Sequence, residues 1–95
     1  MGQQSGNVMK TIGLLGGMSW ESTLAYYRAI NRGVGVKLGG LHSAKIVIYS
    51  VDFEPIEQLQ NAGDWDGTAR ILSKAARSIE AAGADFLLIC TNTMH

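Results

Sequence analysis

The chain has 95 residues, of which 17% are charged and 46% are apolar, and its eight basic residues balance eight acidic ones. This balance leaves no electrostatic footprint for nucleic acid or for an anionic membrane surface. The longest apolar runs are far shorter than the roughly 20 residues of a membrane-spanning helix. We therefore expect a soluble protein without a nucleic-acid or membrane partner. A single cysteine, which cannot form an internal disulfide, favours the cytoplasm.

The first residues are polar and aperiodic, and they lack the basic and apolar regions of a signal peptide. We interpret residues 1–9 as a flexible N-terminal lead. Residues 10–95 are predicted to form one N-terminal α/β lobe, which breaks off before the helix expected after Cys90.

Three apolar, partly β-branched runs follow, at residues 11–15, 45–50 and 85–90. Near-continuous apolar runs of this length are typical of strands buried on both faces of a sheet. Helical periodicity fills the intervals between them. This alternation predicts an α/β fold with a three-layer parallel sheet in βαβαβ order.

The first predicted helix runs from Ser19, a candidate N-cap, to about Arg32. The glycine-rich stretch 33–40 is predicted to be a mobile loop on the rim opposite the site, and we assign it no chemistry.

The second predicted helix runs from Asp64, which can cap it, to Ala82, and Gly83 can close its C-terminus. A short helical turn after Pro55 is only weakly indicated.

The first candidate site is the turn at residues 13–20, between the first strand and the first helix. Its glycines allow close backbone approach, and a helix N-terminus favours an anion. The glycine spacing fits neither a dinucleotide fingerprint nor a P-loop. A tight turn that needs small residues is an equally good interpretation.

The second candidate site is the end of the second strand, in the segment 50–55. Loops at the carboxyl ends of strands line the ligand crevice of open sheets, so Ser50 and Asp52 could meet the ammonium or hydroxyl group of a small molecule. The favoured alternative is turn chemistry, in which Asp52 bonds its own backbone two residues on.

The third candidate site is Cys90, at the carboxyl end of the third strand. There we expect the thiol to open onto a crevice, with a following helix N-terminus lowering its pKa, so that it can act as a base or a nucleophile. Thr91, Asn92 and Thr93 add hydroxyl, amide and backbone donors suited to a carboxylate. The alternative is a cysteine that is only a small buried apolar residue.

Two segments together carry a family resemblance. Lys10 to Thr23, which reads KTIGLLGGMSWEST, and Cys90 to His95, which reads CTNTMH, closely resemble the N-terminal half of the aspartate/glutamate racemase family, in the right order and spacing. The resemblance implies two similar α/β lobes with an active site in the cleft between them. It also implies a homodimer and catalysis without any cofactor, whether pyridoxal phosphate or metal.

The same resemblance implies the roles of individual residues. In the family two cysteines face each other, one per lobe, and Cys90 matches the first of them. The substrate, aspartate or glutamate, is expected to contact residues of all three loops, namely Gly17, Met18, Ser19, Ser50, Asp52, Phe53, Thr91, Asn92 and Thr93. Because the sequence contains no second cysteine, the fragment alone is expected to be inactive. Its open cleft face would also lack a partner, so we expect an exposed apolar edge and a tendency to associate or to be poorly stable.

Two alternatives stay open. Maleate isomerases, hydantoin racemases and arylmalonate decarboxylases use related cysteine geometry, although the turn at residues 16–23 points to the amino-acid racemases. A second class is a non-catalytic lobe that binds a carboxylate or a phosphate, with Cys90 merely buried.

Overall fold

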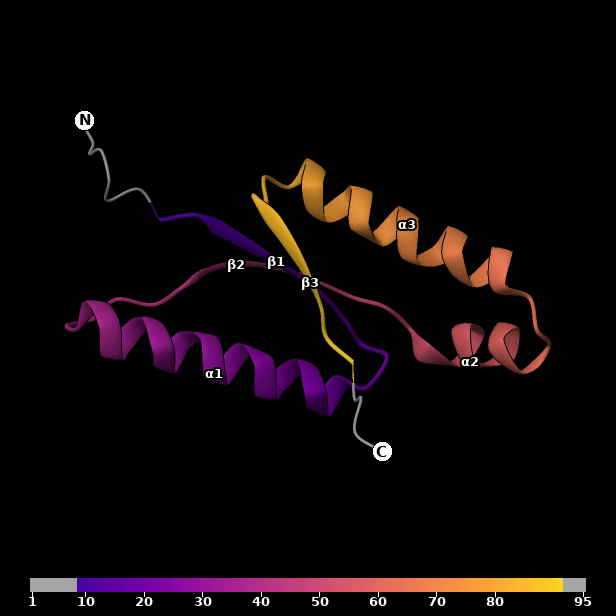
Figure 1. Ribbon diagram of the computed structural model, residues 1–95, viewed down its shortest axis with the longest axis horizontal. Coiled ribbons are helices and arrows are strands. Elements are labelled where there is room, and N and C mark those ends of the chain that lie inside the picture. The colour runs from indigo at the N-terminus through magenta and orange to yellow at the C-terminus, as the bar shows by residue number, and fades with distance from the viewer. Residues whose placement is uncertain (1–8, 92–95) are drawn as a thin grey trace.

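The computed structural model describes residues 9–91, so most of the N-terminal lead and all of Asn92 to His95 lie outside the described residues. Six elements follow one another in the chain: β1 (Thr11–Gly16), α1 (Trp20–Leu38), β2 (Lys45–Ser50), α2 (Phe53–Asn61), α3 (Trp65–Ala81) and β3 (Phe86–Ile89). The strands form one parallel sheet in the order β2-β1-β3. In Figure 1, α1 runs along one side of this sheet and α3 along the other. The predicted α/β fold with alternating strands and helices is confirmed, with α2 as an additional helix.

The register of the sheet assigns each strand residue to a face. Leu15 belongs to the core on the α3 side and pairs with Ile89, and Gly13 pairs with Leu87. Because side chains alternate along a strand, Leu87 and Ile89 face α3, whereas Phe86 and Leu88 face α1.

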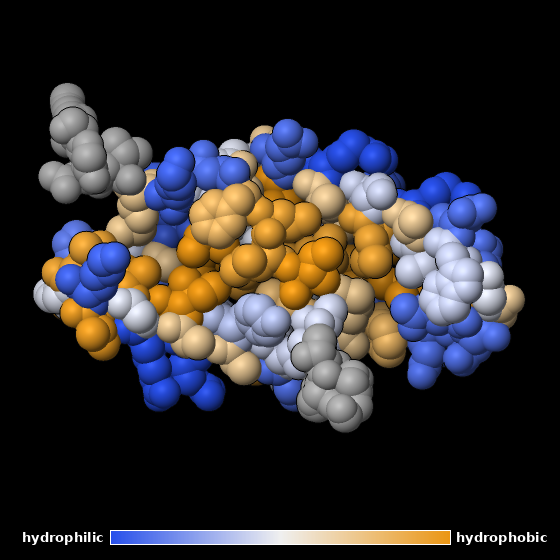
Figure 2. Space-filling view, viewed as in Figure 1, coloured by the Kyte–Doolittle hydropathy of each residue, from blue (hydrophilic) through white to orange (hydrophobic). Residues whose placement is uncertain are grey.

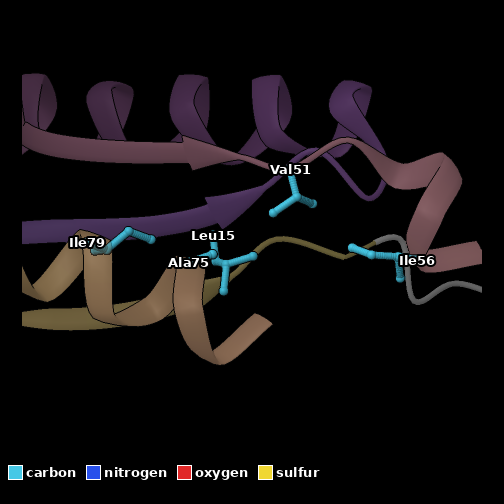
Figure 3. Close-up of a cluster of buried hydrophobic side chains, with 5 residues drawn as sticks. All are labelled: Leu15, Val51, Ile56, Ala75 and Ile79. Carbon is cyan, nitrogen blue, oxygen red and sulfur yellow. The ribbon is translucent and has the colours of Figure 1, made fainter. Parts of the chain in front are cut away.

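The main core lies on the α3 side of the sheet. It consists of five buried side chains from β1, α2, α3 and the residue after β2: Leu15, Val51, Ile56, Ala75 and Ile79 (Figure 3). Gly13 allows α3 to pack this closely, since a Cβ atom at Gly13 would clash with Ile79 Cγ2. The close approach therefore depends on a glycine in the central strand.

Helix α1 is longer than predicted. It continues through Gly33 and Gly35 to Leu38, so the stretch predicted to be a loop is mostly helix. Each glycine inside a helix makes helix formation about 1 kcal/mol less favourable than alanine would. This cost does not end α1, which continues through Val34, Val36 and Lys37. The helix ends only where Gly39 and Gly40 adopt positive φ angles of 73° and 59°. Within residues 9–91, no helix is both long enough and apolar enough to cross a membrane.

Helix α2 was only weakly indicated by the sequence. Asp52 is its N-cap, and Asp52 Oδ1 accepts a hydrogen bond from Glu54 N at 3.4 Å. Ile56 of this helix is completely buried. Tertiary packing therefore stabilises a helix that is too short to show a clear helical periodicity in the sequence.

Helix α3 matches its prediction closely. Asp64 is the N-cap, and Asp64 Oδ1 accepts from Gly67 N at 2.8 Å. Gly83 follows the helix with a φ of 103°, a conformation suited to a helix end.

The strands differ in burial, and this corrects the expectation that all three are buried on both faces. The central strand β1 is buried along its carboxyl half, but β2 is largely exposed and β3 is exposed at every residue. The reason is topological: β2 and β3 are both edge strands of a three-stranded sheet. The predicted exposed apolar edge is confirmed at β3.

Candidate active site

The carboxyl ends of the three strands meet around the end of β1. Leu15 O accepts a hydrogen bond from Cys90 N at 2.9 Å, and Gly16 O accepts one from Val51 N at 2.8 Å. Two consecutive carbonyl groups of β1 thus hold the exits of β3 and β2 on either side. The three predicted loops begin at one edge of the sheet, where open parallel sheets place their ligands.

The loop after β1 is fixed at Gly17. This residue is buried with a φ of 98°, and a Cβ atom here would clash with Val51 O and lie 2.8 Å from Ser50 Oγ. Its amide nitrogen donates a hydrogen bond to Thr23 Oγ1 at 3.1 Å. The β1–α1 turn is therefore pressed against the end of β2, which brings the first two predicted loops together.

Thr23 is not among the predicted site residues, although it belongs to the segment that resembles the family. Its side chain is buried, and a Cβ atom at Gly16 would clash with it. The only sequence signal for this role is a hydroxyl side chain in the first turn of the helix, six residues after Gly17.

Ser19 and Met18 complete this turn. Ser19 is at the predicted N-cap position with extended backbone, but its side chain makes no capping hydrogen bond. Instead, Ser22 Oγ donates to Ser19 Oγ at 3.2 Å. Met18 packs against the core cluster, so at least part of its side chain serves the fold.

The loop after β2 divides between two roles. Asp52 caps α2 through Glu54 N, which is the turn chemistry favoured above, and Phe53 packs against the core cluster. Ser50 is exposed and is the side chain of this loop closest to Gly17. Of the three residues, Ser50 is best placed at the site.

The exposure expected for Cys90 is wrong in this structure, since its side chain is 0% exposed. Alternation from Leu88 places it on the α1 face, beside the end of β1 rather than at the rim. The expected lowering of its pKa is also wrong. Burial raises the pKa of the Cys90 thiol, because desolvation disfavours the thiolate. The group is therefore a protonated thiol at neutral pH.

The rest of the third loop is described only in part. Thr91 is half-buried directly after Cys90. The predicted contacts of Asn92 and Thr93, and the helix expected beside Cys90, lie outside the described residues. Among residues 9–91 no three histidine, cysteine, aspartate or glutamate side chains are grouped as a metal site would require.

The sequence matches the family model described as Asp/Glu/Hydantoin racemase over residues 15–95. The chain belongs to this racemase family. The match includes both segments on which the resemblance was based, apart from residues 10–14.

Two solved structures support the assignment. The chain is 63% identical to a protein from Yersinia pestis assigned as an Asp/Glu racemase, with a TM-score of 0.86 over 92% of this chain. It is 35% identical to an aspartate racemase homologue from Pyrococcus horikoshii OT3, with a TM-score of 0.73 over 90% of this chain. The chain spans only 38% and 37% of those two chains.

Proposed function

We propose that this chain supplies one of two opposed thiols in a cofactor-independent amino-acid racemase that interconverts the L and D forms of aspartate, glutamate or both. The observation that carries the proposal is the hydrogen bond from Cys90 N to Leu15 O, which lies one residue before the Gly16–Gly17 turn. The thiol and the glycine turn that match the family motifs are thereby neighbours at the carboxyl edge of the sheet.

Racemisation requires a proton to leave one face of the α-carbon and another to arrive on the opposite face. A second cysteine, as thiolate, would take the α-proton, so that a Cα–H bond breaks and an S–H bond forms. Cys90 would then donate the proton of its own S–H to the opposite face and become the thiolate. The reverse direction exchanges the two roles.

The burial of Cys90 suits the donor half of this cycle. Because desolvation raises the pKa of the Cys90 thiol, the group rests protonated and ready to donate. A carbanion that forms beside it is neutralised by this proton.

The negative charge that develops on the substrate carboxylate needs donors. Backbone amides at the N-terminus of α1, next to Met18 and Ser19, present a partial positive charge to an anion. Ser50, Asp52, Phe53 and Thr91 to Thr93 are proposed as further substrate contacts.

The 95-residue chain alone is proposed to be inactive, because its sequence has one cysteine. In a racemase-length protein we propose a homodimer in the cytoplasm. The alternative is a non-catalytic lobe that binds a carboxylate or a phosphate, and the complete burial of Cys90 is the observation that favours it.

A chimera separates the two. Residues 1–91 of this chain replace the matching part of the Yersinia protein, and solvent deuterium is followed into the α-carbon of aspartate and glutamate by NMR. Loss of racemisation in Cys90→Ala, with exchange abolished for one enantiomer, supports the racemase. Binding without exchange, unaffected by Cys90→Ala, would establish the binding lobe.

A further inference from the structure

Helix α1 begins differently from α2 and α3. The side chains of Asp52 and Asp64 cap α2 and α3, whereas Ser19 makes no capping hydrogen bond although it occupies the N-cap position of α1. Ser22 Oγ donates to the Ser19 hydroxyl instead. The Ser19 side chain therefore leaves the amides of the first turn of α1 to an anion.

Thr23 holds the same turn from the inside. Its side chain is only 8% exposed, and Thr23 Oγ1 accepts a hydrogen bond from Gly17 N at 3.1 Å. On its other side the turn is pressed against β2, since a Cβ atom at Gly17 would clash with Val51 O. A side-chain cap would bind an amide that faces the anion site. Thr23 instead binds a buried amide, so it fixes the turn without occupying the site.

The Thr23 side chain also lies against the strand position beside the thiol. A Cβ atom at Gly16 would clash with Thr23, so Thr23 fills the space over Gly16. The last paired residues of β1 and β3 are Leu15 and Ile89. Their successors, Gly16 and Cys90, are therefore neighbours across the sheet, and alternation places both on the α1 face.

Strand β3 has no polar side chain of its own with which to place the thiol. Residues 86–89 are all apolar, and each is between 37% and 49% exposed. Apolar side chains gather across the middle of Figure 2, where β3 lies in front in Figure 1. The position of Cys90 relative to the turn therefore depends on its backbone pairing with β1 and on the packing of α1.

We propose that Thr23 is a positioning residue, which fixes the carboxylate-binding turn at a set distance from the Cys90 thiol. This inference rests on the proposed racemase function and extends it to a side chain that need not touch the substrate. Proton transfer requires the α-carbon to lie within reach of the sulfur while the turn holds the carboxylate. A displacement of the turn should therefore lower the rate of the reaction more than the affinity for substrate.

The test is steady-state racemisation by the Yersinia chimera with Thr23→Val or Thr23→Ser. Valine keeps the shape over Gly16 and leaves the amides of α1 in place, but it cannot accept the hydrogen bond from Gly17. We expect kcat to fall by about tenfold or more while KM changes by less than about threefold. Serine retains the acceptor, and kcat of Thr23→Ser should stay within about threefold of the parent value.

Thr68 offers a matched control in α3. It is 7% exposed, and its hydroxyl donates to Asp64 O at 3.3 Å. Thr68→Val therefore also removes a buried hydroxyl from the first turn of a helix, but outside the proposed site. It should leave kcat within about twofold of the parent value. Circular dichroism at the assay temperature verifies that all variants are folded.

A Thr23→Val variant with the parent kcat would overturn the proposal. So would a rise in KM alone, because Thr23 would then shape binding without aligning the thiol, and so would an equal loss of kcat in Thr68→Val. A parent chimera without α-proton exchange refutes the proposed function and this inference together. An active parent with an unaffected Thr23→Val variant refutes the positioning role alone.

Discussion

Gly17 N donates its hydrogen bond to Thr23 Oγ1, across six residues and within the buried part of the turn. This bond joins the loop after β1 to the first turn of α1, while the contact of Gly17 with Val51 joins the same loop to the end of β2. The shape of the proposed carboxylate site therefore depends on a side chain that need not touch the substrate.

Replacing Thr23 by valine keeps its shape but removes the acceptor. The Gly17 amide would be left buried without a partner, which costs about 1 to 3 kcal/mol in the free energy of unfolding. Urea denaturation measures this loss. Thr23→Ser retains the acceptor and is the control, so equal stability of the serine and valine variants would contradict the role of the bond.

Gly17→Ala and Gly83→Ala form a matched pair, because both glycines have φ near 100°. A Cβ at Gly83 meets nothing within 4 Å, whereas one at Gly17 clashes with Val51 O. Gly83→Ala should lower the free energy of unfolding by about 1 kcal/mol, because alanine is strained at a positive φ angle. Gly17→Ala should cost clearly more in the same denaturation experiment, and similar losses would show that the turn is not held tightly against β2.

The cap of α3 can be compared with the cap of α2. Asp64→Ala removes an acceptor 2.8 Å from Gly67 N and should destabilise the chain by about 1 kcal/mol. Asp52→Ala removes a longer interaction of 3.4 Å and should cost less. Thermal unfolding ranks the two variants, with Asp64→Asn as the conservative control, and a reversed order would refute this assignment of the caps.

The burial of Cys90 predicts a pH dependence. Its pKa in the folded chain is raised above that in the unfolded chain, so the folded state holds the proton more tightly. The resulting stabilisation is complete below about pH 8.5, the ordinary thiol value, and is lost as pH rises through the higher folded value.

Urea denaturation between pH 7 and pH 10 tests this. The parent chain should lose more stability over that range than Cys90→Ala, which has no thiol to titrate. Other groups titrate equally in both proteins, so the difference isolates Cys90. Parallel pH profiles of the two proteins would mean that burial does not raise the pKa of the Cys90 thiol.

The order of elements and the meeting of the three loops at one edge of the sheet could be predicted from the sequence, because apolar runs and the caps at Asp64 and Gly83 are local signals. The end of α1 could not be predicted, since Gly33 and Gly35 suggested that the helix stops before them, but it continues to Leu38 and ends where Gly39 and Gly40 adopt positive φ angles. Helix α2 was also underestimated, because its stability comes from Ile56 in the core rather than from its own periodicity.

The environment of Cys90 could not be predicted from its position along the chain. Its place at a strand end suggested access to solvent, but the side-chain alternation of β3 turns it toward α1. The bond between Gly17 and Thr23 was equally hidden, since it depends on the path of the turn in three dimensions.

The central claim is that Cys90 serves one face of the substrate α-carbon while a second thiol serves the other. The most direct test is solvent deuterium exchange in the chimera, measured separately for the L and D enantiomers, with Cys90 replaced by serine. We predict that racemisation disappears and that exchange is lost for one enantiomer while it persists for the other. Racemisation near the parent rate, with both enantiomers still exchanging, would contradict the claim.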